Sequence, residues 1–443
     1  MKKFIQTLKN IWKIDDLKSR LLFTFGIILI YRLCSYVTLP GIDPAQLQAL
    51  KSQAAGGIIS LLDMFSGGAF SNASIVALGI MPYISASIVV QLLGMAIPFF
   101  QKMQKEGESG RRKINQITRY LTVFILILQA PTYIANLHGQ LPPSAFLIQG
   151  TKFIVISTII LISGTMFIMW LGERITDKGI GNGISLIIMV GIIARLPVSL
   201  IQEIAMRLEN KGGGLVAFLV EVVIWLVVIG INILLVQGVR KIPVQYAKRI
   251  VGNKQYGGVR QYIPLKVNAA GVMPIIFAQA LMFVPVTLAG FVASSESMSG
   301  FLHAFTNITG FWYNFTFALL IVVFTYFYTA VTINPTQMAE DMKKNGGFIP
   351  GVKPGKKTVE YLDSIMSRIT LPGSLFLAFV AVLPAFAKIL GISYQFSQFF
   401  GGTTLLIMVG VVLDTLQQIE SHLLMRHYDG LMKSGRIKGR SGN

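Results

Sequence analysis

The chain has 443 residues, of which 53% are hydrophobic and only 13% are charged. Soluble domains carry about 25% charged residues, so this composition excludes an ordinary soluble protein. The formal net charge is +20. Nucleic-acid binding or the basic cytoplasmic loops of a membrane protein would each explain that charge, and the positions of the basic residues decide between them.

Apolar residues gather in runs of about 17 to 25, the length that crosses a bilayer. The first run contains Cys34, the sole cysteine, so we expect no disulfide framework. We predict ten membrane spans, at residues 21–38, 73–99, 120–137, 153–171, 184–200, 215–236, 269–291, 313–333, 371–390 and 403–424.

A short apolar segment at about 56–70 lies between the first two spans, and it carries Gly56-Gly57 and Gly67-Gly68. It is too short to cross a bilayer and too apolar for an ordinary loop. A re-entrant helix that buries its backbone inside the protein fits both properties, and the glycines would let it reorient. A static external cap is the alternative.

A glycine-rich run, Gly179 to Gly183, lies between the fourth and fifth spans. It does not follow a strand, so it is not a dinucleotide site. We predict a hinge or a helix start there.

Two later connectors, about 237–268 and 334–370, are long. The first alternates polar and apolar residues around Gly252-Asn253, which predicts a β-hairpin. The second contains Pro350-Gly351 and Pro354-Gly355 and is expected to be an ordered loop. Long loops in a compact protein are usually functional, so we expect a macromolecule to dock on them. A merely solvated basic loop would explain the charge but not the length.

Most of the 39 Lys and Arg residues fall in connectors on the side of the N-terminus. The positive-inside rule then predicts a multi-pass protein with both termini in the cytoplasm. We expect no cleavable signal peptide, because residues 1–20 are polar and no cleavage site follows the first run.

Ten spans divide as five plus five, and an odd number inverts the second half and places a pathway between the halves. The predicted organisation is a cytoplasmic N-terminus (1–20), an N-terminal half (21–200), an external hinge (201–214), a C-terminal half (215–424) and a cytoplasmic tail (425–443).

No catalytic set emerges from the sequence. The four histidines have no carboxylate or cysteine at ligand spacing, and no phosphate-binding loop is present. We therefore expect no enzyme activity, no cofactor and no metal. Ionisable residues inside spans are few, with Arg32, Glu221 and Asp414 the clearest. Their scarcity counts against an ion-coupled secondary transporter with inverted repeats, which stays the alternative function. A membrane scaffold is a third reading, but it leaves the re-entrant segment unexplained.

Six motifs in order along the chain resemble those of the SecY family, the central subunits of the bacterial protein-conducting channel. They are Met64–Ala69 (MFSGGA), Ala77–Ile88, Gly107–Lys113 (GESGRRK), Gly179–Ser185 (GIGNGIS), Leu265–Gly271 (LKVNAAG) and Phe348–Gly355 (FIPGVKPG). The resemblance implies an all-α polytopic fold, with ten transmembrane helices in two inverted five-helix halves around an hourglass pore and a re-entrant plug helix.

The resemblance also assigns site residues. An aliphatic pore ring would consist of Ile80, Ile84, Ile184, Ile188, Ile276 and Ile407. The plug, about 56–70, would include Ile58, Ile59, Leu61, Leu62, Asp63, Met64 and Phe65. A lateral gate that opens towards lipid would include Ser85, Ile88, Gln91, Thr122 and Asn268. The docking loops would use Arg249, Lys254, Lys353, Lys356 and Lys357. The family commonly has arginine where this chain has Lys353, and lysine keeps the charge but loses the planar fork.

The implied function is to conduct unfolded secretory polypeptides across the bacterial cytoplasmic (inner) membrane and to release membrane-protein helices laterally into it. The implied partners are SecE-like and SecG-like small membrane subunits, the SecA motor ATPase, the translating ribosome, secretory preproteins and nascent membrane proteins, a YidC-type insertase, and the lipid bilayer. The energy would come from the motor or the ribosome, because the chain has no nucleotide site.

Overall fold

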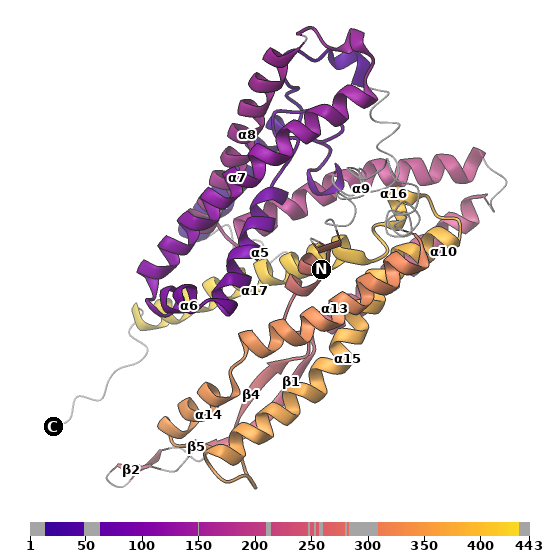
Figure 1. The fold of residues 1–443 in the computed structure, drawn as a ribbon. Coiled ribbons are helices and arrows are strands. Elements are labelled where there is room, and N and C mark those ends of the chain that lie inside the picture. The colour runs from indigo at the N-terminus through magenta and orange to yellow at the C-terminus, as the bar shows by residue number, and fades with distance from the viewer. Residues whose placement is uncertain are drawn as a thin grey trace. The chain divides into compact units, whose positions relative to one another are not determined.

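The structure, a computed structural model, describes residues 14–47, 63–148, 150–209, 214–246, 249–251, 254–256, 260–279, 281–282 and 309–433. The chain forms two compact units (Figure 1). The first comprises Met1–Ser199 and Gly410–Asn443, and the second comprises Leu200–Val409.

Long helices make up most of the first unit. They are α2 (Asp15–Cys34), α5 (Met81–Ala96), α6 (Pro98–Lys105), α7 (Glu108–Gln140), α8 (Thr151–Lys178), the first part of α9 (Gly183–Glu209) and the later part of α17 (Gly402–Lys433). Short 3₁₀ turns, η1 (Pro44–Leu47) and η2 (Pro143–Ala145), lie in the connectors. Proline stands in the first turn of both α5 and α6, where its missing N–H costs nothing.

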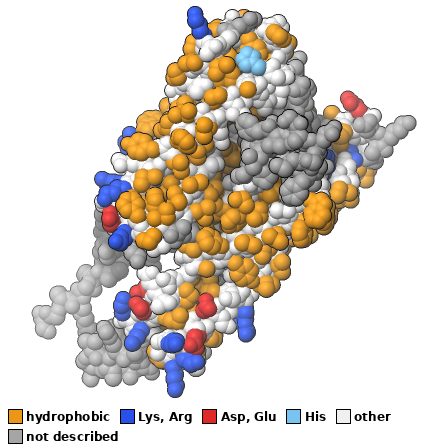
Figure 2. Space-filling view, viewed as in Figure 1, with side chains coloured by type: hydrophobic (Ala, Val, Ile, Leu, Met, Phe, Trp, Pro, Cys, Tyr) orange, Lys and Arg blue, Asp and Glu red, His pale blue; other side chains and the backbone are white. Residues whose placement is uncertain are grey.

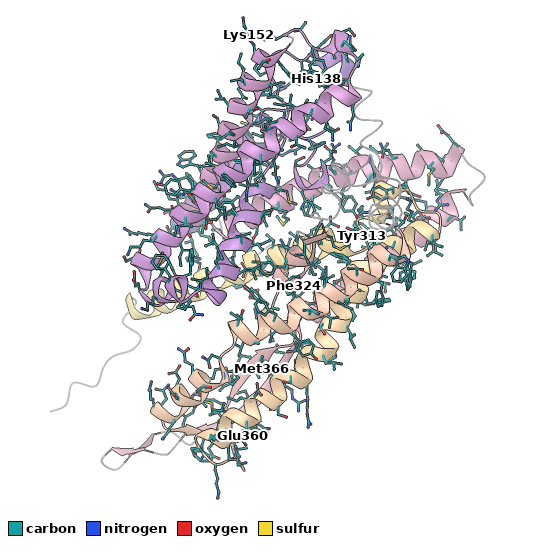
Figure 3. The ribbon with its side chains drawn as sticks, in the orientation of Figure 1. His138, Lys152, Tyr313, Phe324, Glu360 and Met366 are labelled. Carbon is teal, nitrogen blue, oxygen red and sulfur yellow. The ribbon has the colours of Figure 1, made fainter. Side chains whose placement is uncertain are left out.

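The core of the first unit lies where α7 and α8 meet the connectors after α2 and α7. His138, near the end of α7 (Figure 3), stacks on Phe146 at 4.1 Å between ring centroids. A bridge between Ile42 and Phe146 ties the two connectors together. The buried cluster contains Leu39, Ile42, Leu47, Phe70, Ala73, Ala77, Ala130, Tyr133, Ile134, Leu137, Leu141, Ala145, Phe146, Phe153 and Leu161.

The second unit combines long helices with a small sheet. Its helices are the end of α9, α10 (Gly214–Gln237), α13 (Phe311–Thr332), α14 (Pro335–Lys344), α15 (Lys356–Ile389), α16 (Tyr394–Ser397) and the start of α17. Residues 273–279 are also helical. Tyr313 and Phe317 of α13 pack with Leu377 of α15 in one apolar core, and Tyr313 is marked on α13 in Figure 3.

Strand β1 (Val239–Tyr246) pairs antiparallel with β4 (Arg260–Lys266), with Val239 opposite Lys266. Between them, β2 (Arg249–Val251) pairs with β3 (Lys254–Tyr256). The hairpin predicted for 237–268 is therefore confirmed, although Gly252-Asn253 lies outside the described residues. Strand β5 (Gly347–Phe348) pairs with β1 on its other side, giving the order β4-β1-β5.

This pairing joins the two long connectors into one body, which the sequence did not predict. Its core contains Ile242, Val244 and Leu265 from the strands and Met366 from α15, and Figures 1 and 3 show the strands beside the first half of that helix.

Among the described residues, seven helices are long and apolar enough to cross a membrane, or up to eight if the bent pair α5 and α6 forms one span. The predicted first span coincides with much of α2, whereas only residues 269–279 and 281–282 of the predicted span 269–291 are among the described residues. Figure 2 shows hydrophobic side chains over much of the visible helix surface, with Lys and Arg near helix ends. On α10, Val216 and Leu234 are each 72% exposed, which requires lipid or a partner around this helix.

Candidate functional site

Residues 63–71, which comprise the described end of the predicted plug (63–70) and the next residue, Ser71, form a compact, self-bonded turn. The Ser66 hydroxyl donates to the Asp63 carbonyl oxygen (3.1 Å) and accepts from the Phe70 backbone N–H (3.0 Å). The Gly68 N–H donates to the same Asp63 carbonyl (2.8 Å). We call this segment the plug anchor. The Met64 and Phe65 side chains are buried, and Ile58, Ile59, Leu61 and Leu62 lie outside the described residues.

Two helices hold the plug anchor by its backbone. From α2, the Tyr31 hydroxyl donates to the Ser66 carbonyl oxygen (3.2 Å), and an Arg32 guanidinium nitrogen donates to the Gly67 carbonyl oxygen (2.9 Å). From α7, the Tyr133 hydroxyl donates to the Phe70 carbonyl oxygen (2.9 Å). Buried carbonyls that lie outside regular structure thus gain partners, as a membrane protein requires.

Helix α9 holds the plug anchor by a side-chain cluster. One Arg195 guanidinium nitrogen forms an ion pair with the Asp63 carboxylate and donates to the Ser71 hydroxyl (2.7 Å). The other Asp63 oxygen accepts from the Ser71 backbone N–H (2.7 Å). Asp63 is 7% exposed. A carboxylate this buried is stable only when it is paired and hydrogen-bonded, and both conditions hold here.

Gly67 and Gly68 both lie close to α9 in a backbone conformation that favours glycine. Both have positive φ, at 65° and 93°. A Cβ on Gly67 would lie 2.8 Å from the Gly191 Cα, and a Cβ on Gly68 would lie 2.8 Å from the Arg195 guanidinium. At Gly67 glycine is required for close approach as well as for backbone conformation, because the neighbouring atom is backbone. At Gly68 the neighbour is the end of a side chain, and the positive φ is the main reason for glycine. The predicted role of the pair as a hinge concerns movement and stays a prediction.

Arg195, Ser71, Tyr31 and Tyr133 were not among the predicted site residues. Two sequence signals point towards the ion pair. Asp63 is a charge inside an apolar segment, and Arg195 is one of the few basic residues outside the connectors predicted to be cytoplasmic. A charged residue that lies within or next to apolar segments, away from the basic connectors, needs a partner of opposite charge.

Four predicted pore-ring residues belong to the first unit, namely Ile80, Ile84, Ile184 and Ile188. Ile276 and Ile407 belong to the second. Ile84 donates its N–H to the Ile80 carbonyl (3.1 Å), so these two lie one helical turn apart. The ring as a whole stays a prediction.

The α9 residues that contact the plug anchor lie on the same face of this helix as two of the predicted ring isoleucines. Ile184, Ile188, Gly191 and Arg195 stand at positions i, i+4, i+7 and i+11, which fall on one side of a helix. The face predicted to narrow the pore is therefore the face that holds the anchor.

The glycine-rich run before α9 is a helix start, as predicted, because α9 begins at Gly183. A Cβ on Gly183 would lie 1.9 Å from the Gly172 carbonyl oxygen, so α8 and α9 meet closely here. The Gly181 N–H donates to the Gln418 side chain of α17 (2.9 Å).

The predicted lateral-gate residues bond mainly within their own helices. On α5, the Ser85 hydroxyl donates to the Met81 carbonyl (3.2 Å) and the Gln91 amide donates to the Ser87 hydroxyl (3.2 Å). On α7, Thr122 donates to the Thr118 carbonyl (2.7 Å). Ile88 and Asn268 are buried. Their role in a gate stays a prediction.

The predicted docking residues lie on the two joined connectors, which the positive-inside rule predicts to be cytoplasmic. Asn334 caps α14 by accepting from the Thr336 N–H (3.1 Å), and Pro335 follows it. Lys353, Lys356 and Lys357 are exposed before and at the start of α15, where Figure 2 shows Lys and Arg side chains together. Arg249 is the first residue of β2, and Lys254 is the first residue of β3.

A second buried ionic cluster, which we call the hinge cluster, lies in the second unit. Arg207 of α9 pairs with Glu203 (Nε to Oε1, 3.1 Å) and with Glu221 of α10. It also donates to the Gly391 carbonyl (3.0 Å), while Glu203 accepts from the Ser393 N–H (2.9 Å).

Helix α9 continues into the predicted hinge 201–214 and ends at Glu209. Beside the hinge cluster, burial raises the pKa of Tyr394, which keeps its phenol neutral. Among the described residues, no group of three or more His, Cys, Asp or Glu is placed to hold a metal ion.

Comparison with known proteins gives consistent matches. A family model described as SecY matches residues 74–416. The protein translocase subunit SecY of Mycobacterium bovis is 42% identical over 455 residues, covering 97% of this chain and 99% of the relative. That of Aquifex aeolicus is 42% identical over 433 residues, covering 96% and 99%.

Solved structures match the fold. One described as the structure of a protein conducting channel has a TM-score of 0.59 at 17% identity, covering 91% of this chain and 92% of that one. Sec61 in a canine ribosome-channel complex gives 0.55 at 16% identity, covering 91% and 92%. At this identity the likeness concerns the fold, and it confirms the predicted all-α polytopic class with ten transmembrane helices.

Proposed function

This chain belongs to the SecY family, and on that premise we propose that its ring isoleucines form the waist of a channel that residues 56–70 close from outside. Family membership makes the chain a protein-conducting subunit of a translocase and not an enzyme. The coupled-transporter alternative lacks support, because relatives that match over nearly the whole chain are translocase subunits.

The shared face of α9 carries this proposal. Ile184 and Ile188 are β-branched and apolar, so a narrow ring of such residues offers no hydrogen bonds and excludes water and ions. Gly191 and Arg195 continue the same face and hold the plug anchor. One helix surface would thus serve both the constriction and its seal.

We propose that the substrate is an unfolded secretory polypeptide, and that nascent membrane helices leave sideways through the seam that contains Gln91, Thr122 and Asn268. Gln91 and Thr122 bond within their own helices. A hydrogen bond between helices in a membrane is itself worth only about 1 kcal/mol or less, so such a seam opens readily. The chain is a membrane protein. We place it in the bacterial cytoplasmic membrane with both termini inside, because its basic residues follow that orientation.

The joined connectors β4-β1-β5 are proposed as the docking surface for a SecA-type motor and a translating ribosome. Their exposed lysines suit acidic protein surfaces and RNA phosphates. A related channel was solved in a ribosome-channel complex, which favours the ribosome as one partner. SecE-like and SecG-like subunits are proposed to cover exposed apolar helix faces such as that of α10.

Reconstituted vesicles test the proposal. Vesicles with this chain, a SecE-like subunit and a SecA-type motor should protect a secretory preprotein from external protease when ATP is supplied. Vesicles that lack this chain serve as the control. Equal protection in both preparations would contradict the proposal.

A further inference from the structure

We propose that Arg195 is a positioning residue that keeps the plug anchor seated on α9 while the channel is at rest. The inference rests on the proposed function and adds to it the charged contact that holds the closed state. The group it acts on is the Asp63 carboxylate, with Ser71 as the bridging hydroxyl.

The three residues form a closed cycle of contacts. Arg195 binds Asp63 and the Ser71 hydroxyl (2.7 Å), and Asp63 binds the Ser71 N–H (2.7 Å). The Ser71 hydroxyl then donates to the Gly68 carbonyl oxygen (3.3 Å). Removing Arg195 would leave a buried carboxylate without its countercharge, and such a group either takes up a proton or draws the segment towards water.

The other contacts of the plug anchor differ in kind. Tyr31, Arg32 and Tyr133 all donate to backbone carbonyls, and these hydrogen bonds would form with almost any side chain on the plug. The Tyr133 ring also packs edge-on against Phe70, at 4.7 Å between ring centroids, which is an apolar contact without charge. Among the contacts of the described residues, the Arg195 cluster joins plug side chains to a pore-lining helix, so its strength depends on plug sequence and charge.

The position of Arg195 on α9 gives the contact its functional meaning. Arg195 follows Ile188 by seven residues, or about 10 Å along the helix on the same face. A plug held at Arg195 is therefore held at a set height from the ring. Gly191, between the two, lets the Gly67 backbone lie against the helix.

A double-mutant cycle tests the proposal in reconstituted vesicles. Asp63→Asn and Arg195→Gln should each raise resting ion conductance, by on the order of tenfold, because the unseated state is a minor state whose population each change raises. The double variant should conduct no more than the stronger single variant, because both changes remove one interaction. Arg195→Lys, which keeps the charge, should recover part of the seal. Motor-driven export should persist in all variants.

Asp43→Asn is the matched control. It makes the same charge change in the same connector, where, among the described residues, the carboxylate accepts a local bond from the Ala45 N–H (3.0 Å). Ser71→Ala, a milder change, keeps the backbone bond to Asp63 and should raise conductance less; it covers the case in which a charge variant fails to fold.

Several results would overturn the proposal. These are unchanged conductance in both single variants and in Ser71→Ala, additive effects in the double variant, or an equal rise in Asp43→Asn. Failure of the proposed function looks different, because wild-type vesicles would then export nothing.

Discussion

Replacing Arg207 by methionine should destabilise the second unit strongly. The arginine lies between the Glu203 and Glu221 carboxylates, and it also binds the Gly391 carbonyl (3.0 Å). The Glu203 side chain is fully buried, and that of Glu221 is 10% exposed. Methionine fills similar space without charge, so Arg207→Met leaves two buried carboxylates facing each other.

The size of the effect follows from that geometry. Removing one partner of a buried ion pair costs about 3–5 kcal/mol, because the remaining charge keeps its desolvation penalty. For a unit of roughly 200 residues, 1 kcal/mol shifts the melting temperature by about 2–4 °C, so the variant should melt roughly 10 °C lower.

Thermal unfolding in detergent, followed by loss of monodisperse protein, measures this shift. Arg20→Met is the matched control, since Arg20 makes an exposed pair with Asp16 (3.4 Å) and should change little. Adding Glu203→Gln and Glu221→Gln to Arg207→Met should recover part of the loss. A wild-type melting temperature for Arg207→Met, or no recovery in the triple variant, would refute the reasoning.

Three further predictions address the ring, the docking surface and helix packing. Replacing Ile84 and Ile276 together by asparagine should raise ion leak in vesicles, because a polar ring holds water. Lys353→Glu should slow motor-driven export without changing the amount of protein in the membrane, because it reverses a docking charge. Gly183→Ala should destabilise the first unit by about 1–3 kcal/mol, since its Cβ would meet the Gly172 carbonyl at 1.9 Å.

Each of these has a matched control. Val216→Asn on the exposed face of α10 should not change ion leak, and Lys344→Glu, in an exposed pair with Asp341 (4.0 Å), should affect export less than Lys353→Glu. Gly139→Ala adds a Cβ in open space and should be neutral.

An ion leak through Val216→Asn equal to that of the ring variant would contradict the predicted ring. Normal export in Lys353→Glu would remove this lysine from the docking contact, and unchanged melting of Gly183→Ala would mean that α8 and α9 have room to separate.

Features that depend on local sequence were predictable. Hydropathy located most spans, but it identifies only the stretch of a helix that lies inside the membrane. α7 starts at Glu108 and α15 at Lys356, well before the predicted spans at 120 and 371, because charged turns continue a helix outside the membrane. The hairpin at 237–268 and the helix start at Gly183 were also predictable, because turn residues determine the backbone conformation of the residues next to them.

Contacts between distant residues were not predictable. Asp63 and Arg195 are 132 positions apart in the sequence. They meet only when α9 packs against the turn at 63–71. The pairing of β5 with β1 has the same character, because a two-residue strand carries no signal of its own. The predicted second span began at 73, whereas helix α5 begins at Met81, because the chain turns at Gly79 (φ 57°).

Site-specific photo-crosslinking from Ile84 to a stalled secretory chain tests the central claim most directly. With the motor and ATP present, a crosslinker at Ile84 should capture the stalled chain, and one at Val216, 72% exposed on α10, should not. Omitting ATP should abolish the product. Equal capture at both positions, or none at Ile84 under active export, would contradict a polypeptide path through the predicted isoleucine ring.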